Sequence, residues 1–463
     1  MNPTPLSQIA ELAGATIESG DANVVVDTVS TDSRTIQPGQ LFVALCGENF
    51  DAHNFVETVA KSGVAGAIVE HGWKGNVPKQ FALLRVKDTL LAYQNLAANY
   101  RTLLPLTVLA ITGSNGKTST KDFTAAVLAR KFRVTKTEGN FNNHVGLPRT
   151  ILEATWEDEI AVWEIGMNHP GEIAALARIA RPDAGIITNV GVAHIEFMGT
   201  REAIADEKGA LAEAVASDGW LILNADDPFA GRIAPRTAAR VILAGTMSGG
   251  IRAAEISQSP NGSEFTILEG AHRCRAQLPV PGLHMIQNAL FAVAAGRAFG
   301  ITLEEAAGAL ASAPLSKARL QVKTIRGIQF LDDSYNANPD SVKAALRTLV
   351  ELAADGKRIA VLGEMLELGA ETERGHREVG EKAATLGIDQ LIAIGEKAKL
   401  TVAAAERAGL KSAVAVANAE EAAEVLERIA RPGDLVLIKG SRTARTELVL
   451  EEFAKHQMEN ARP

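Results

Sequence analysis

Short apolar runs alternate with helical periods along most of the chain. In the middle, β-branched runs predict buried strands at 107–111, 133–137, 160–165, 184–190, 220–225 and 240–244, with helical stretches between several of them. The last third repeats this pattern, with strands predicted at 328–331, 358–362, 390–394, 413–416 and 434–438 and helices at 340–352, 374–386, 397–408 and 419–429. Such alternation predicts parallel sheets covered by helices on both faces, an α/β protein.

Two stretches depart from this rhythm. Before residue 86 the chain predicts a smaller α/β unit, with a helix at 6–13, strands at 24–30, 40–45, 65–69 and 81–86, and a polar, turn-rich loop at 31–39. A helix is expected from 88 to 100. Between 251 and 278, short alternating runs flank an Asn-Gly turn at 261–262, which predicts a small antiparallel excursion before a helix at 284–299.

Length and charge narrow the class of protein. The 463 residues suggest about three domains of ~150 residues each. A net charge of −8 without a polybasic stretch argues against a nucleic-acid partner, so we expect small-molecule substrates. Cys46 and Cys274 fit no metal or redox spacing. The N-terminus lacks a signal-peptide pattern and no apolar run approaches the ~18 residues of a membrane span, so we expect a cytoplasmic protein.

The stretch at 107–120 has the character of a phosphate-binding loop. A buried strand breaks into Gly113 and Gly116, whose backbone N–H groups can turn toward an anion, and a helix follows. Lys117 would reach the terminal phosphates of a nucleoside triphosphate, and Thr118 would offer its hydroxyl to Mg²⁺. The loop is shorter than the full pattern because its first glycine is missing, and a turn that merely needs glycine is the alternative.

Two further residues follow predicted strands and are candidate metal ligands. Glu164 ends a strand that otherwise looks buried, so its carboxylate needs a cation, either a metal or a lysine. Mg²⁺ is favoured because Thr118 ends a strand of the same sheet and could share the ion. His194 lies just past another strand end, where a ligand and an ordinary hydrogen-bonded core histidine are about equally expected.

Lys208 is predicted to point into the core. Its helical neighbours at three and four residues' distance are Ile204, Ala205, Leu211 and Ala212, all apolar. Desolvation favours the neutral amine, which can add CO₂ to give a carbamate, and this converts a cation into a metal-binding anion. The alternative is a lysine that snorkels to solvent or pairs within the core.

Other polar residues near strand ends are candidate ligands for a nucleotide. Asn288 could hydrogen-bond a base edge, Asp333 suits a ribose diol, and Arg319 could cross a cleft to a phosphate. The amide cluster at 140–144 can donate to phosphate or peptide oxygens. It could equally be only a turn, as could the Asn-Pro stretch at 335–339.

Together these motifs resemble the Mur ligases, ATP-dependent amide-forming enzymes of peptidoglycan synthesis, over essentially the whole chain. The resemblance is carried by an ordered series, Thr-Gly-Ser-Asn-Gly-Lys-Thr at 112–118, Gly-Asn-Phe-Asn-Asn-His at 139–144, Glu-Ile-Gly-Met-Asn-His at 164–169, the stretch 189–194, Lys208, Asn288 and Asp333. It implies a small N-terminal α/β domain at 1–86 that binds a uridine nucleotide substrate. A central P-loop ATPase-like parallel-sheet domain at 87–314 and a C-terminal Rossmann-like α/β domain at 315–463 would follow.

Within the family, several stretches look like the members that add D-alanyl-D-alanine. The stretches that do so are 333–341 and 361–369. A different resemblance holds near the N-terminus, where 30–45 and 49–53 look like the uridine-nucleotide-binding domain of the tripeptide and dipeptide ligases. The Asp-Asn-Pro-Arg signature of the diaminopimelate-adding members is absent. The alternatives are another amino-acid-adding ligase of the superfamily and, in a different class, a nucleotide-dependent switch without ligase activity.

The resemblance implies a reaction and a site. ATP would phosphorylate the terminal carboxylate of UDP-N-acetylmuramoyl-tripeptide, and the amine of D-Ala-D-Ala would displace phosphate. The ATP site would comprise Gly113, Ser114, Asn115, Gly116, Lys117, Thr118, Ser119, Asn288, Arg319 and Asp333; the uridine nucleotide site Ser30, Asp32, Ser33, Arg34, Asn142 and Asn143; and the dipeptide side Asn336, Asn338, Ser441 and Arg442.

The resemblance also assigns metal ions. Thr118 and Glu164 would hold one Mg²⁺, and His194 with a carbamylated Lys208 would hold a second; Lys117 completes the catalytic set. We expect a monomer. The run at 443–447 departs from the small-residue and Met-Glu sequence usual in the family, which leaves the acceptor contacts near Ser441 and Arg442 open.

Overall fold

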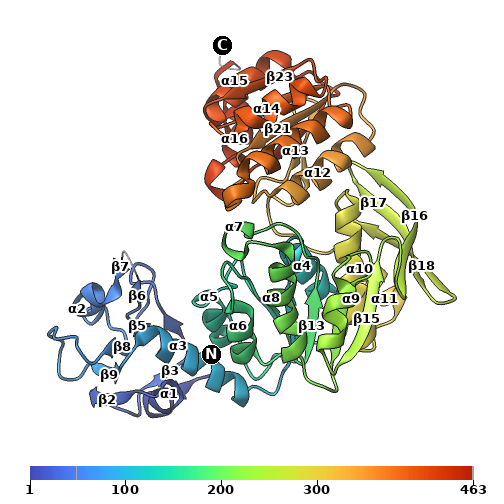
Figure 1. Ribbon diagram of the computed structural model, residues 1–463. Helices are drawn as coiled ribbons and strands as arrows, with labels where there is room; N and C mark the ends of the chain where they lie inside the picture. The colour runs from blue at the N-terminus through green and yellow to red at the C-terminus, as the bar shows by residue number, and fades with distance from the viewer. Residues whose placement is uncertain (48–49, 461–463) are drawn as a thin grey trace.

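The computed structural model describes residues 1–47 and 50–460 and contains three successive units (Figure 1). The N-terminal unit lies to one side, and the C-terminal unit lies above the central one. Each of the three is built on its own sheet of five or more strands. The α/β class and three-unit architecture expected from the sequence are therefore confirmed. In the described part of the chain, no helix is both long and apolar enough to span a bilayer.

The N-terminal sheet has the strand order β2-β9-β8-β5-β4. Its strands are β4 (Val29–Ser30), β5 (Leu41–Val43), β8 (Gly66–Glu70), β9 (Ala82–Val86) and β2 (Thr16–Ser19). Helix α1 (Leu6–Ala13) has the predicted bounds, and α2 (Val56–Val59) is a single turn. A hairpin of β6 (Cys46–Gly47) and β7 (Phe50–Asp51) projects from this unit.

The prediction of a single strand at 24–30 is wrong. The segment forms two strands, β3 (Val25–Val26), which pairs with β1 (Thr4–Pro5), and β4, which joins the larger sheet. The break falls at Asp27 and Thr28, whose carbonyls accept hydrogen bonds from the Met1 ammonium (2.7 Å) and the Leu41 N–H (3.0 Å). Hydrophobic alternation continues through the break, so the pattern gave no sign that the chain changes sheets here.

Helix α3 (Thr89–Leu103) joins the first unit to the second. Asp88 caps it by accepting the Leu91 N–H at 2.8 Å. The buried face of α3 includes Tyr93, Leu96 and Tyr100, and it packs in one hydrophobic cluster with residues of both units. Because this core is continuous, the N-terminal unit is held firmly to the central one.

The central sheet has the order β11-β12-β10-β13-β14-β15-β16-β17-β18. Its first strands are parallel and their bounds are β10 (Thr107–Thr112), β11 (Val134–Lys136), β12 (Ile160–Glu164), β13 (Ala184–Ile187), β14 (Trp220–Asn224) and β15 (Arg240–Gly245). Side chains of β10 alternate between two cores. On one face, Leu109 and Ile111 pack with α4 (Lys117–Leu128), α10 (Leu283–Ala298) and α11 (Leu303–Leu310). On the other face, Val108 and Ala110 pack with α5 (Gly146–Glu153), α6 (Glu172–Ala180) and α8 (Arg201–Ala214).

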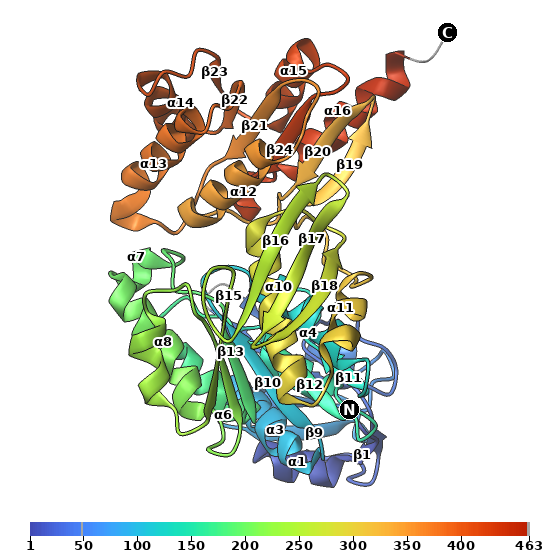
Figure 2. The ribbon, with the colours of Figure 1, turned by 90° about the vertical axis from the view of Figure 1, so that its right-hand side faces the viewer.

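The predicted antiparallel excursion is confirmed. Strands β16 (Ile251–Ser259), β17 (Gly262–Glu269) and β18 (His272–Leu278) pair antiparallel at the edge of the central sheet. They rise toward the C-terminal unit (Figure 2), where Gln258 donates to the Glu351 carboxylate at 3.2 Å. This arm therefore links the central unit to the third unit.

The C-terminal sheet has the order β19-β20-β24-β21-β22-β23 and is parallel except for β19. Its strands are β19 (Gln321–Ile325), β20 (Ile328–Asp332), β21 (Arg358–Gly363), β22 (Gln390–Ile394), β23 (Ala413–Val416) and β24 (Leu435–Lys439). The unit is completed by the helices α12 (Pro339–Glu351), α13 (Thr372–Thr385), α14 (Ala398–Arg407), α15 (Ala419–Ile429) and α16 (Glu447–Asn460). The sequence analysis missed β19, a short and only partly buried edge strand.

Candidate active site

A cavity of about 950 Å³ opens between the central and C-terminal units. Its walls come from loops that follow β10, β12, β13 and β14 on one side and β20, β21 and β24 on the other. Ligands of open parallel sheets bind at such carboxyl ends. Of the predicted residues, it is lined by Ser114, Asn115, Gly116, Lys117, Thr118, Ser119, Asn142, Asn143, Glu164, His194, Asn288, Arg319, Asp333, Asn336, Asn338, Ser441 and Arg442.

The phosphate-type loop between β10 and α4 requires both of its glycines. Gly113 and Gly116 have φ angles of 151° and 82°, which disfavour other residues. A Cβ at Gly113 would also lie 1.8 Å from Oγ1 of Thr188, and one at Gly116 would lie 2.4 Å from Oδ1 of Asn288. The loop is therefore packed tightly against the strand end after β13 and against α10.

Lys117 begins α4 and folds back over the loop. Its Nζ donates to the Gly113 carbonyl at 2.8 Å. Burial lowers the pKa of Lys117, and the nearby Glu164 carboxylate opposes this shift. The ammonium is thus already directed at the loop where a phosphate would lie.

Glu164 is only 2 % exposed and lies beside Thr118, as expected. The Thr118 hydroxyl donates to Oε2 at 3.0 Å, and the Asn142 amide donates to Oε1 at 2.7 Å. Among the described residues, no lysine or arginine forms an ion pair with this carboxylate. A buried carboxylate whose direct partners are a hydroxyl and an amide suits a hard cation such as Mg²⁺, although the Lys117 ammonium is also near it.

Lys208 is buried on α8, with 1 % of its surface exposed. Desolvation lowers its pKa well below the ordinary value; the positive charge of Lys117 adds to this effect and Glu207 opposes it. Within residues 1–47 and 50–460 it makes no ion pair with a carboxylate. These surroundings fit a neutral amine, which is the form that adds CO₂.

His194 has a left-handed backbone (φ 60°) and faces the C-terminal unit. Its Nδ1 lies 2.7 Å from Oε2 of Glu367, without the alignment of a hydrogen bond. This contact lowers the pKa of Glu367. Across the described chain, no three His, Cys, Asp or Glu side chains are grouped closely enough to hold a metal by themselves. A site at His194 thus needs a further oxygen ligand.

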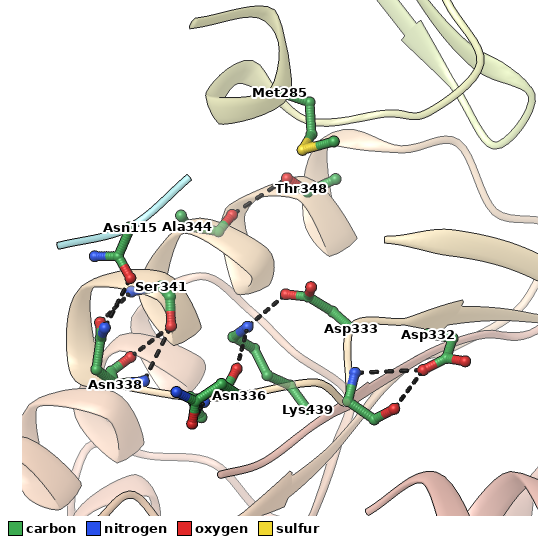
Figure 3. Close-up of polar contacts among 12 residues, drawn as sticks. Asn115, Met285, Asp332, Asp333, Asn336, Asn338, Ser341, Ala344, Thr348 and Lys439 are labelled. Atoms are coloured by element: carbon green, nitrogen blue, oxygen red, sulfur yellow. Dashed lines mark hydrogen bonds and ion pairs between the residues drawn. The ribbon is translucent and has the colours of Figure 1, made fainter. Parts of the chain in front are cut away.

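Asp333 directly follows β20 and Lys439 ends the neighbouring strand β24; their side chains form a buried ion pair at 2.5 Å (Figure 3). Lys439 also donates to the Asn336 carbonyl at 3.0 Å. His284 lies close by: burial lowers its pKa to about 4, while the charges of Asp333 and Lys439 act in opposite directions. The sequence analysis assigned no role to Lys439 or His284, although Lys439 ends a strand, as the other candidates do.

The dipeptide-side residues lie around α12 and the end of β24. Asn338 caps α12 by accepting the Ser341 N–H at 3.0 Å, and its Nδ2 donates to Asn115 at 2.7 Å (Figure 3). Ser441 is buried, and within the described residues its hydroxyl has no hydrogen-bond partner. Arg442 is exposed near Glu447.

The predicted uridine-site residues fall into two separate groups in the structure. Ser30, Asp32, Ser33 and Arg34 do not line the cavity, and neither do Gly113 and Lys208. Hydrogen bonding by Arg34 lowers the pKa of Asp32 to about 2.

The other two residues of that set lie on the loop before α5. Asn142 lies against Glu164 rather than beside Asp32, and Asn143 accepts the Gly146 N–H at 2.8 Å at the start of α5. Helix α5 contacts β4, which ends at Ser30. The loop therefore runs from Glu164 toward the N-terminal unit. Asn49, part of the 49–53 motif, is outside the described residues.

Known proteins with the same architecture identify the class. The Mur ligase middle domain matches residues 111–296, and the Mur ligase glutamate ligase domain matches 318–442. A crystal structure of MurF from Acinetobacter baumannii superposes with a TM-score of 0.90 at 31% identity, covering 98% of this chain and 99% of that one. MurF ligase from Thermotoga maritima in complex with ADP gives 0.84 at 28% identity, covering 94% and 98%. The chain belongs to the Mur ligase family, a class of ATP-dependent, ADP-forming ligases.

Curated relatives narrow the class further. UDP-N-acetylmuramoyl-tripeptide–D-alanyl-D-alanine ligase of Bacillus subtilis is 38% identical over 97% of this chain and 98% of its own length. The enzyme of the same name from Escherichia coli is 37% identical over 98% of both. The similarity to these ligases thus includes all three units, the N-terminal one as well as the two that the domain models match.

Proposed function

We propose that this chain joins D-alanyl-D-alanine to UDP-N-acetylmuramoyl-tripeptide, with cleavage of ATP to ADP and phosphate, in peptidoglycan synthesis. The observation that carries the proposal is the cavity, which combines the phosphate-type loop with strand ends of the C-terminal unit. Full-length similarity to ligases of that name supports it. The proposal includes a division into a uridine-nucleotide domain (1–86), an ATP domain (87–314) and an acceptor domain (315–463). It also includes a cytoplasmic location and a monomeric state.

The reaction needs charge neutralisation and positioning more than covalent catalysis. A carboxylate oxygen of the tripeptide attacks the γ-phosphorus of ATP, ADP leaves, and an acyl phosphate forms. The amine of the dipeptide then adds to the acyl carbon and loses a proton, and inorganic phosphate is expelled from the tetrahedral intermediate. Lys117, Arg319 and the N-terminus of α4 would bind the phosphoryl oxygens, on which negative charge is concentrated.

The donor set suits two divalent ions. Thr118 and Glu164 would hold one Mg²⁺, and His194 with carbamylated Lys208 would hold the other. When bound, Mg²⁺ would supply positive charge that reduces the repulsion between the anionic substrates. The chain's own residues orient the ligands: Asn142 fixes the Glu164 carboxylate, and Glu367 fixes the His194 ring.

The remaining side chains would bind the organic parts of the substrates. Asn288, wedged against Gly116, would contact the adenine, and Asp333, held by Lys439, would contact the ribose. Ser30, Asp32, Ser33, Arg34 and Asn143 would bind the uridine nucleotide, while Asn336, Asn338, Ser441 and Arg442 would line the dipeptide side.

A donor and acceptor screen with phosphate release as the readout tests this function. We expect release only when ATP, UDP-N-acetylmuramoyl-tripeptide and D-Ala-D-Ala are all present. Hydroxylamine should trap the acyl phosphate when the dipeptide is omitted. Release with a single amino acid or glutamate as acceptor would favour another ligase of the superfamily, and failure of all acceptors would leave a nucleotide-dependent switch.

A further inference from the structure

The segment between α11 and β19 joins the central and C-terminal units and carries Arg319. In its middle, at Ser316, it is held by Asp122, which lies on α4 one helical turn after Thr118 and is 1 % exposed. Asp122 Oδ2 accepts both the N–H and the hydroxyl of Ser316, at 2.9 and 2.6 Å. A buried carboxylate thus fixes the connection between the two units to the helix of the phosphate-type loop.

The backbone on both sides of Arg319 has an unfavourable conformation. Ala318 and Leu320 have φ angles of 56° and 52°, in the left-handed region that residues with a Cβ rarely adopt. Such residues persist only where their surroundings hold them. Leu320 is fully buried, and the Ala318 N–H donates to Gln321 at 3.2 Å. The position of Arg319 is therefore imposed by contacts and is not the relaxed state of the linker.

The guanidinium of Arg319 is directed at the phosphate-type loop. It lies 4.0 Å above the centre of the Tyr335 ring, and its Nη2 lies 3.3 Å from Oγ1 of Thr118. Its Nε is buried and has no hydrogen-bond partner among the described residues. A donor held in this way beside Thr118 is available to an anion.

We propose that Asp122 is a positioning residue of the active site, which holds Arg319 at Thr118 by anchoring the linker at Ser316. Asp122 does not line the cavity, so its effect on a bound nucleotide is indirect. The inference rests on the proposed function for the role of Arg319 toward phosphate. A purely structural role is the competing explanation, because Asp122 also pairs with Lys136 at 3.1 Å.

The first test compares ADP affinity by calorimetry in the intact protein, without any acceptor. Asp122→Asn and Ser316→Ala weaken or remove the anchor, and we expect each to weaken ADP binding about tenfold. The KM for ATP in the full reaction should rise similarly, with a smaller change in kcat. Lys136→Met is the matched control: it removes the ion pair of Asp122 with Lys136 (3.1 Å), shorter than the one with Lys121 (3.6 Å), but leaves both Ser316 contacts, so ADP affinity should change less than about threefold.

A double-mutant cycle separates positioning from stability. In an Arg319→Ala background, Asp122→Asn should cause no further loss of ADP affinity, because the group it positions is gone. Three results would overturn the proposal. The losses in ADP affinity could be additive in the double variant, the affinity could be unchanged in Asp122→Asn or in Ser316→Ala, or Lys136→Met could lose as much affinity as Asp122→Asn. Since ADP binding needs no acceptor, these outcomes are independent of whether D-Ala-D-Ala is the acceptor.

Discussion

Asn338 Nδ2 donates to Asn115 Oδ1 across 2.7 Å, so the first turn of α12 is in direct contact with the phosphate-type loop. A second contact runs in parallel, from the Val192 N–H to the Asp340 carboxylate at 3.1 Å. The two residues of the first contact are 223 positions apart in the chain. The C-terminal unit is therefore in direct contact with the loop, and the cavity lies between surfaces that already touch.

Loss of the Asn338 contact should loosen this junction. In Asn338→Ser a short side chain can still cap α12 but no longer reaches Asn115, so we expect the KM for D-Ala-D-Ala to rise about fivefold. X-ray scattering should show a larger radius of gyration. Ser341→Ala is the control, since Ser341 takes part in the cap but not in the contact with Asn115. Equal effects of the two changes would assign the loss to the cap.

Lys208 provides a test of the carbamate. Lys208→Ala should abolish turnover, and formate or acetate should partly restore it by supplying carboxylate oxygens. Lys117→Ala should show no such rescue, because a carboxylate cannot replace its cation. In the wild-type protein, ¹³CO₂ should give a carbamate signal by NMR. Full activity of Lys208→Ala without added carboxylate would refute the role.

The lowered pKa of Lys208 gives this site a pH dependence. The amine is neutral above its pKa and can then add CO₂; as the pH falls through that pKa it is protonated and the carbamate is lost. Activity should therefore fall on acidification and should recover with added bicarbonate. A profile that is insensitive to bicarbonate at every pH would contradict this mechanism.

Gly116→Ala should be severely damaging. It places a Cβ 2.4 Å from Asn288 at a φ of 82°, so we expect a loss of about 1–3 kcal/mol in the free energy of unfolding and loss of ATP binding. Gly139→Ala is the control, because its φ is also positive (54°) but no atom lies within 4 Å of the added Cβ. Denaturant titration and calorimetry measure both effects. Equal losses in the two variants would show that backbone strain alone matters.

His284 should make the fold sensitive to acid. Its pKa is lowered from 6.5 to about 4 by burial, so between these values the unfolded chain binds a proton that the folded chain does not. This contribution to stability is complete above pH 6.5 and is lost as the pH falls toward 4. His284→Asn should reduce the slope of unfolding free energy against pH in that window. His272→Asn, at an exposed position, is the control; equal slopes in all three proteins would contradict the assignment.

The sequence predicted those parts of the fold whose pattern is local. The bounds of α1 and the strand at 107–111 follow from apolar periodicity alone. Thr118 lies beside Glu164 because it begins the helix after β10, and Glu164 ends β12, the neighbouring parallel strand. Edge strand β19 escaped prediction because it is short and three of its five residues are polar, and its two apolar residues, Val322 and Ile325, are only partly buried. Its apolar periodicity is therefore weak.

Partners brought together by tertiary structure could not be predicted in this way. Lys439 pairs with Asp333 from 106 residues away, and Glu367 reaches His194 from a loop of another unit. Strand ends marked Asp333 and His194 as candidates but not their partners, because the order of strands in the sheet decides which ends meet. For the same reason Asp122, within an ordinary-looking helix, gave no sign of its contact with the linker.

The ion pair of Lys439 and Asp333 restricts the kinds of inhibitor that can occupy this corner of the cavity. A basic group attracted to the Asp333 carboxylate would meet a buried ammonium 2.5 Å from one of its oxygens and would be repelled. An acidic group would face the carboxylate itself. Compounds directed here should therefore carry neutral hydrogen-bond donors, and medicinal chemistry at this position should gain affinity from hydroxyl or amide groups rather than from charge.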